Sequence, residues 1–371
     1  MSSRTTLVFV ELNRLPKYTL LNISRTKRLF PEIPIVLLTN VSNKKELIEL
    51  QEKNICEIVK VELNPNRVML MNSSKVQESK KDNFWISTLE RVFVLLDYHQ
   101  GIPDVGLLHL ESDVILFPSF PWDSFAKLPE LSWGRYSATH DVAAILYSPN
   151  GMQSDLLRKA LLKELEEDPD ITDMTALSRV VNKKGIVHRM LPSAFSDSNF
   201  TLRSSFNCTA AQYAELTKNV QLFSGIFDLG SIGMWIDGID PKHSLGISST
   251  MPTSIFRKGE SLIDLQDTKF AVGDDGQLSV LASNLKINIH SLHVHSKRLR
   301  WFSQEWKAEI SSAIKAINAG RKVYRFSFHV FIKVFVQNLK QGTLLRLIAI
   351  KILPHKVKRL ISSIKRMKKN T

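Results

Sequence analysis

Apolar segments and helix-like segments alternate along the first 110 residues. Four apolar segments rich in β-branched or aromatic residues predict buried strands: "TLVFVEL" (6–12), "IPIVLLTN" (33–40), "ICEIVKVEL" (55–63) and "VGLLHL" (105–110). Helical spacing of the apolar positions predicts helices between them, at 17–30, 44–54 and 83–99. Strands that alternate with helices predict an α/β fold in which helices cover a mostly parallel sheet.

The pattern is less regular elsewhere. The polar stretch 64–82 predicts a long loop. The remaining predicted elements are a strand at 143–148, helices at 154–168 and 172–185, and a hairpin around Gly273–Gly276 that leads into a strand within 270–297. Residues 222–241, "LFSGIFDLGSIGMWIDGIDP", mix Gly and Asp with large apolar side chains, which predicts a loop packed around a ligand.

The net charge of +14 is concentrated at the end of the chain. Residues 310–371 contain 15 Lys and Arg and no Asp or Glu, which leaves 35 basic and 36 acidic residues in 1–309. A neutral main body argues against a nucleic-acid-binding protein. We therefore predict a catalytic domain at 1–309 and a basic tail at 310–371.

The last part of this tail has an amphipathic pattern. After Pro354, apolar residues recur at helical spacing among lysines and arginines, at Val357, Leu360, Ile361, Ile364 and Met367. Such a basic helix is expected to lie on an anionic membrane surface, where each basic residue contributes on the order of 1 kcal/mol. A solvated helical tail or one that contacts nucleic acid are the alternatives.

Other features bear on the location of the protein. Every stretch of eighteen residues contains a charged residue, which argues against a membrane-spanning helix. The N-terminus lacks the apolar core of a signal peptide, and two cysteines are too few for a disulfide framework or a zinc site. The expected location is cytoplasmic, peripheral at the cytosolic face of a membrane.

Two carboxylates interrupt the apolar run "LLHLESDVILF" (107–117). Burying an unpaired carboxylate is unfavourable, and Glu111 and Asp113 are spaced to face the same side of an extended chain. They also follow a predicted parallel strand, at the sheet edge where ligands bind in open α/β folds. A shared cation is one interpretation; an ordinary turn after a strand is the other.

Further candidate residues lie in three segments. In "LHVHSK", His293 and His295 alternate with apolar residues and share a face next to Lys297, which suits metal or phosphate binding as well as hydrogen-bonded core histidines. In "FWISTLER", Trp85, Thr88 and Arg91 share a helical face, although a core Trp and a surface Arg are the simpler reading. The Gly and Asp residues of 222–241 form either tight turns or part of a small-molecule site.

Together the runs "FWISTLERVFVLLDY", "LLHLESDVIL", "DMTAL", "FDLGSIGMWIDGIDP" and "LHVHSK" resemble nucleotide-sugar-dependent glycosyltransferases of the GT-A fold. More narrowly, the chain is similar to a bacterial, polysaccharide-associated group with a histidine–leucine–glutamate–x–aspartate form of the DxD motif. The resemblance spans roughly residues 6 to 300 in order. Glu111 departs from the first Asp of a typical DxD motif, whereas Asp113 occupies the position of the usual metal ligand.

The resemblance implies a Rossmann-like, mostly parallel sheet, a nucleotide-sugar donor, a glycan or lipid-linked acceptor, and Mn²⁺ or Mg²⁺. It places metal ligands at Asp113, Glu111, His293 and His295. It implies substrate contacts at Glu11, Asn13, Trp85, Thr88, Arg91, Glu111, Gly233, Asp237, Gly238 and Lys297. An inverting transfer also needs a carboxylate base, for which Asp228 and Asp173 are the candidates.

Within this assignment Glu11 and Asn13 would contact the base of the nucleotide, Lys297 the phosphate, and Arg91 the diphosphate or Asp113. The alternative is a catalytically inactive nucleotide-sugar-binding or basic interaction protein. A sugar-phosphate nucleotidylyltransferase is disfavoured because "VELNRLPKY" has no glycine-rich signature after the first strand.

Overall fold

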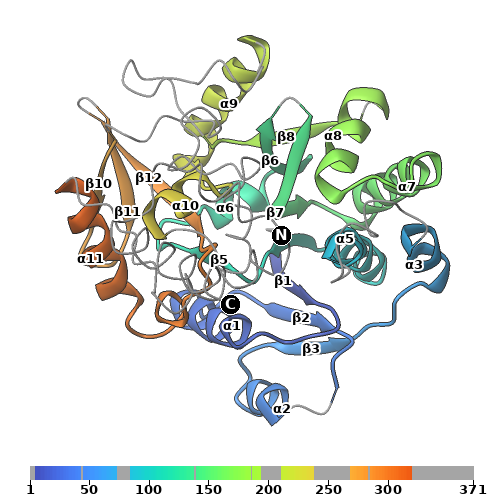
Figure 1. Ribbon diagram of the computed structural model, residues 1–371, viewed down its shortest axis with the longest axis horizontal. Helices are drawn as coiled ribbons and strands as arrows, with labels where there is room; N and C mark the ends of the chain where they lie inside the picture. The colour runs from blue at the N-terminus through green and yellow to red at the C-terminus, as the bar shows by residue number, and fades with distance from the viewer. Residues whose placement is uncertain are drawn as a thin grey trace, which may run out of the picture. The chain divides into compact units, whose positions relative to one another are not determined.

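The computed structural model describes residues 5–42, 45–72, 84–137, 139–184, 186–193, 210–237, 268–282 and 285–319. All of them belong to one compact unit built on two β-sheets (Figure 1). The first sheet has seven strands, in the order β3-β2-β1-β4-β7-β6-β8. The second has the order β10-β11-β12-β5, and β9 also pairs with β12.

The strands of the first sheet are β1 (Thr5–Glu11), β2 (Ile35–Thr39), β3 (Glu57–Lys60), β4 (Gly106–Leu110), β6 (Leu131–Ser137), β7 (His140–Ser148) and β8 (His188–Leu191). Those of the second are β5 (Val114–Leu116), β9 (Gly225–Phe227), β10 (Lys269–Val272), β11 (Leu278–Ala282) and β12 (Leu285–His293). In the first sheet β7 is antiparallel to both of its neighbours, and the other pairings are parallel. The predicted mostly parallel α/β fold is therefore confirmed.

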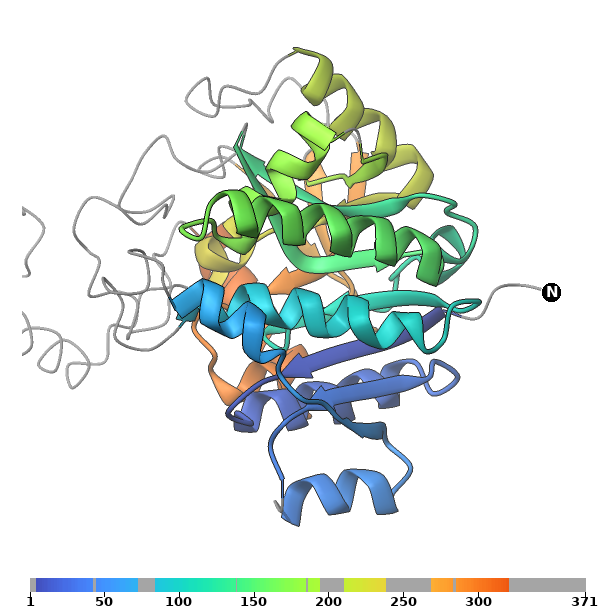
Figure 2. The same ribbon diagram turned by 90° about the vertical axis from the view of Figure 1, so that its right-hand side faces the viewer.

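The helices are α1 (Lys17–Leu29), α2 (Lys45–Glu52), α3 (Pro65–Asn72), α5 (Phe84–Gln100), α6 (Trp122–Ala126), α7 (Gly151–Glu167), α8 (Asp173–Lys184), α9 (Ala210–Phe223), α10 (Ser231–Asp237), the 3₁₀ turn η3 (Leu299–Trp301) and α11 (Trp306–Asn318). Helices α5, α7 and α8 cover one face of the first sheet and lie side by side in Figure 2. Helices α1, α2 and α6 cover the other face, and α11 packs on the second sheet. Both faces of β1 are covered, and all seven of its residues are buried, as its continuous apolar sequence requires.

The segment 64–82 departs from the predicted loop. Its first part forms helix α3, and residues 73–83 lie outside the described residues. The side chain of Asn64 accepts hydrogen bonds from the backbone N–H groups of Asn66 and Arg67, and Pro65 occupies the first turn, where its missing N–H is not needed. Arg67 then pairs with the buried Glu90 of α5 at 3.0 Å, which holds the short helix against the body. The sequence feature that indicates this helix is the cap at Asn64, which was interpreted as part of a polar loop.

The predicted domain boundary between residues 309 and 310 falls inside α11. Ile310 and Ile314 of this helix are buried in the core of the second sheet, so the first turns of the predicted tail belong to the body. The rest of the tail, including the predicted membrane-binding helix after Pro354, lies outside the described residues. Among the helices that are described, none combines the length and the apolar character needed to cross a bilayer.

Candidate metal and substrate site

The strand predicted at 105–110 is β4, and the run 107–117 also contains a second strand, β5, that was not predicted. β4 belongs to the first sheet and β5 to the second, and the turn that carries Glu111 and Asp113 joins them. The backbone N–H of Glu111 still bonds to Ala144 of β7, and that of Val114 bonds to the carbonyl of Glu111. The chain therefore changes sheet between the two acids, and both carboxylates reach the surface, with 16% and 13% of their side chains exposed.

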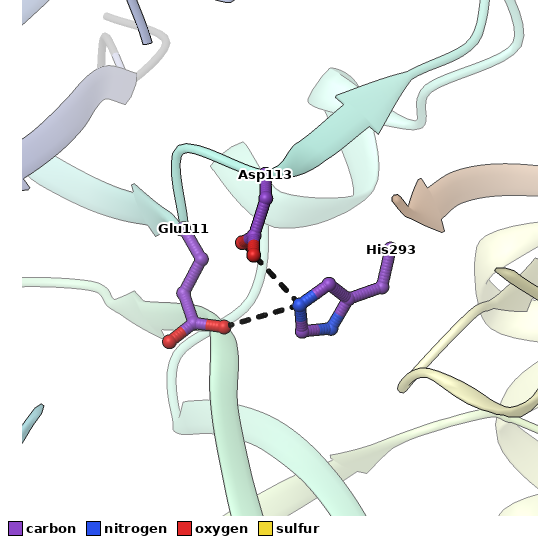
Figure 3. Close-up of side chains that lie close together, drawn as sticks. All are labelled: Glu111, Asp113 and His293. Atoms are coloured by element: carbon purple, nitrogen blue, oxygen red, sulfur yellow. Dashed lines mark ion pairs between the residues drawn. The ribbon is translucent and has the colours of Figure 1, made fainter. Parts of the chain in front are cut away.

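His293, at the end of β12, completes the group. β12 pairs antiparallel with β5, which places His293 opposite Val114, and the N–H of Val294 donates to the carbonyl of Asp113 at 2.7 Å. The Nε2 atom of His293 lies 3.3 Å from Asp113 Oδ1 and 3.7 Å from Glu111 Oε2 (Figure 3). The structure thus brings the predicted acids and one predicted imidazole together from segments about 180 residues apart in the chain.

These three side chains fit a divalent cation. One ligand atom from each lies within 4.8 Å of the others, and two ligands on opposite sides of such an ion are roughly 4–5 Å apart. Two carboxylate oxygens and one imidazole nitrogen form a donor set that suits Mn²⁺ or Mg²⁺. Burial lowers the pKa of His293, but Asp113 and Glu111 outweigh it and raise the pKa to about 8. The two carboxylates therefore favour a positive charge at the position of the His293 ring.

Further cations surround the two acids. Arg91 pairs with Glu111 at 2.6 Å, and the Lys297 ammonium lies 3.4 Å from Asp113 Oδ2. Burial raises the pKa of Asp113, but His293, Lys297 and His295 together hold the pKa well below its usual range. The ring of His295 stacks on that of His293 with centroids 4.0 Å apart, and His295 is not part of the three-residue metal group.

Two other buried carboxylates lie near this centre. Asp173 begins α8, and burial raises its pKa to about 6, against the opposing effects of Arg91, the N–H of Met174 and the Thr88 hydroxyl. Its Oδ1 atom has no hydrogen-bond partner within the described part of the chain. Glu11 ends β1 and accepts a hydrogen bond from Thr19 at 2.7 Å; burial also raises its pKa.

The raised pKa of Asp173 leads to a prediction for stability. Because the pKa is higher in the folded than in the unfolded state, the wild type loses stability as pH rises from about 4 through 6. Asp173→Asn removes this loss. The free energy of unfolding of the variant, relative to that of the wild type, should therefore rise by about 1–3 kcal/mol as the pH increases from 4 to 8. Thermal melts in EDTA across this range measure the gain. Asp123→Asn, at an exposed site on α6, is the control, and an Asp173→Asn difference that does not change with pH would contradict the prediction.

Asp228, a predicted catalytic residue, holds two elements together. Its carboxylate accepts hydrogen bonds from the N–H groups of Gly230, Ile232 and Gly233 at the start of α10, and from the N–H of His293 on β12. A Cβ on Gly233 would lie 1.9 Å from the His293 carbonyl oxygen, so only glycine allows α10 to approach β12 this closely. The Gly-Asp segment predicted as a ligand loop is therefore partly a strand and a helix that support His293.

The remaining predicted residues lie around this centre or outside the described part. Asp237 bonds to Ser296 and Arg298, which fixes the turn that carries Lys297. Asn13 is exposed, has a left-handed backbone (φ 65°), and exchanges hydrogen bonds with Asn40 at the ends of β1 and β2. The side chain of Trp85 and all of Gly238 lie outside the described residues.

Sequence reasoning missed three side chains of α1 that bond to Glu11, to the backbone on either side of Asp113, and to the end of β5. The polar side chains of Thr19, Asn22 and Arg25 are buried on one face of α1. The available signal was their spacing of three, on the helix face that should be apolar if it packs on a sheet.

No protein-family model and no curated protein matches this sequence. Solved structures do match. The glycosyltransferase GlyE of Streptococcus pneumoniae TIGR4 is 13% identical, over 51% of this chain and 46% of GlyE, with a TM-score of 0.36. The galactosyltransferase LgtC, solved with donor and acceptor sugar analogues, is 12% identical over 57% of this chain and 83% of LgtC, with a TM-score of 0.38. The PaToxG glycosyltransferase is 10% identical over 49% of this chain and 71% of its own, with a TM-score of 0.30. This chain thus spans about half the length of GlyE, and at these identities the likeness concerns the fold alone.

Proposed function

We propose that the protein is a metal-dependent glycosyltransferase that moves a sugar from a nucleoside-diphosphate sugar to a glycan or lipid-linked acceptor. One observation carries the proposal: Glu111, Asp113 and His293 converge where a strand of the parallel part of the first sheet ends. The ordered set of sequence motifs that resembles GT-A enzymes supports the same reading.

In this proposal Glu111, Asp113 and His293 hold Mn²⁺ or Mg²⁺, which when bound would act as a Lewis acid on the diphosphate leaving group. Lys297 lies beside Asp113 and supplies a second positive charge for the diphosphate. Arg91 holds the carboxylate of Glu111 through a partly buried ion pair and thereby fixes its direction. Glu11 and Asn13, at the end of β1, are the proposed contacts for the nucleotide base.

A transfer with inversion requires a carboxylate that deprotonates the acceptor hydroxyl. Asp173 fits this role better than Asp228 because its Oδ1 lacks a partner among the described residues and its pKa is raised to about 6. Each oxygen of Asp228, in contrast, already accepts two backbone hydrogen bonds. We therefore propose Asp173 as the base and Asp228 as a supporting residue.

The wild-type protein tests the proposal directly. Incubation with UDP-, GDP- and TDP-sugars and Mn²⁺ should release sugar from one donor class, and chelation of the metal with EDTA should stop the release. The matching nucleotide should raise the melting temperature in the presence of Mn²⁺. Absence of both effects with every donor would favour a binding or interaction protein instead.

The nature of the acceptor is proposed from the sequence after residue 309. Its excess of basic residues suits an anionic membrane surface, where a lipid-linked acceptor would reside. A chain that ends at Gly320 should then no longer float with anionic liposomes, whereas the full chain should.

A further inference from the structure

β5, the three-residue strand that follows Asp113, has a strand on only one of its edges in the described part of the chain. On that edge β12 pairs with Ile115, and Val294 bonds to the Asp113 carbonyl. Backbone groups of successive strand residues point to opposite edges, so three carbonyl groups face away from β12: those of Ser112, Val114 and Leu116. Because Ser112 and all of β5 are buried, these carbonyls need partners other than water.

Side chains of helix α1 provide these partners. The Nδ2 atom of Asn22 donates to the carbonyls of Ser112 at 3.1 Å and Val114 at 2.6 Å. Arg25, three residues further on, donates to the carbonyl of Leu116 at 2.8 Å. Both α1 side chains are buried, with exposures of 0% and 2%. Helix α1 therefore takes the place of a neighbouring strand along this edge of β5.

The two bonds of Asn22 lie on either side of Asp113. The bond to the Ser112 carbonyl holds the peptide plane that precedes Asp113, and the bond to the Val114 carbonyl holds the plane that follows Val114. Asn22 thus restrains the backbone on both sides of Asp113, and hence the direction of its side chain. On the opposite edge the Asp113 carbonyl is held by Val294, next to His293. We infer that Asn22 is a positioning residue for the candidate metal site, because it sets the separation of Asp113 from His293. This inference rests on the proposed function.

The chemistry of the position requires an amide. Both N–H groups of Asn22 are used, whereas its Oδ1 has no partner among the described residues, so the donors are the part of the side chain that matters. An apolar replacement leaves two buried carbonyls without donors, and a carboxylate would place an oxygen against two others. Arg25 extends the same row of donors, and its guanidinium lies 4.1 Å from the ring centroid of Trp306 on α11. Asn22 and Arg25 thus connect the turn that carries Asp113 to Trp306 in the core of the second sheet.

The test compares two asparagines that make the same kind of bond. Asn219 on α9 is buried and donates from Nδ2 to the carbonyl of Met190 at 2.7 Å, as Asn22 does to β5. Binding of Mn²⁺ to the full chain, without nucleotide, is measured by the loss of the free-ion EPR signal, well below each melting temperature. Asn22→Ala should weaken Mn²⁺ binding at least about tenfold, as loss of an outer support of a metal site does. Asn219→Ala should stay within twofold of the wild type, although both variants lose stability.

The outcomes separate the inference from the function. If the wild type binds Mn²⁺ and Asn22→Ala binds it equally well, the positioning role is refuted and the metal site stands. If the wild type itself does not bind Mn²⁺, the proposed function and the inference both fail. Should Asn22→Ala not fold, Asn22→Ser takes its place, since one hydroxyl donor can replace one of the two bonds. It should bind Mn²⁺ less tightly than the wild type, and unchanged affinity would refute the inference.

Discussion

Asp113→Asn is expected to lower metal-dependent turnover of the donor at least about 100-fold, since loss of a ligand removes several kcal/mol of charge stabilisation. Asparagine keeps the size of the side chain but lacks its charge, and Asp113 faces both His293 and Lys297. The affinity for Mn²⁺ should fall together with the rate. The rate of donor hydrolysis and the titration of bound Mn²⁺ measure the two effects.

Asp123→Asn is the matched control for this change, because it alters the same residue type at an exposed position on α6 and should leave both quantities unchanged. A second readout needs no metal. Asp113 contributes most to raising the pKa of His293 to about 8, so the pKa of that imidazole should fall in Asp113→Asn. Titration of the histidine ring protons by NMR records this. Full Mn²⁺-dependent turnover by Asp113→Asn would contradict the assignment of the metal site.

Asp228→Asn is expected to destabilise the protein by about 2–5 kcal/mol, which corresponds to a fall in melting temperature of roughly 5–15 °C. The carboxylate accepts four backbone hydrogen bonds at 2.7–3.0 Å, from the start of α10 and from His293. An asparagine would turn an amide donor toward two of these N–H donors. Thermal or urea unfolding measures the loss.

The same variant separates a supporting role from a catalytic one. If Asp228 holds α10 against β12, activity should fall only as far as the folded fraction and the placement of His293 are affected, and part of it should return under stabilising conditions. If Asp228 were the base, activity would disappear while the melting temperature stayed within a few degrees of the wild-type value. That second result would move the base from Asp173 back to Asp228.

The sequence predicted the fold well where periodicity and burial act together. β1, β2 and β4 are apolar runs that alternate with helices along the chain, and the structure confirms each of them. Helices α3 and α10 are among the elements that escaped prediction, because their signal is not apolar periodicity. Helix α3 depends on a cap at Asn64, and helix α10 depends on a buried Asp228 and on glycines that allow close packing.

The sequence indicated that Glu111, Asp113 and His293 lie together, although it also included His295, and it did not indicate which side chains support them. Glu111, Asp113 and His293 stand out because carboxylates and imidazoles are conspicuous within apolar runs. That Asn22 bonds to the backbone around Asp113 depends on tertiary contacts between residues about 90 positions apart, which no local pattern records. The same holds for Asp228, whose surroundings suggested chemistry but whose partners are backbone N–H groups.

The pairing of β5 with β12 has a consequence for synthesis on the ribosome. β1, β2 and β3 pair with one another within the first 60 residues and can associate early, and β4 then pairs with β1. The candidate metal group cannot assemble until the segment around residue 293 has emerged, nearly two hundred residues later. A nascent chain would therefore lack the candidate metal group until this segment has been synthesised, even where the strands before it have already paired.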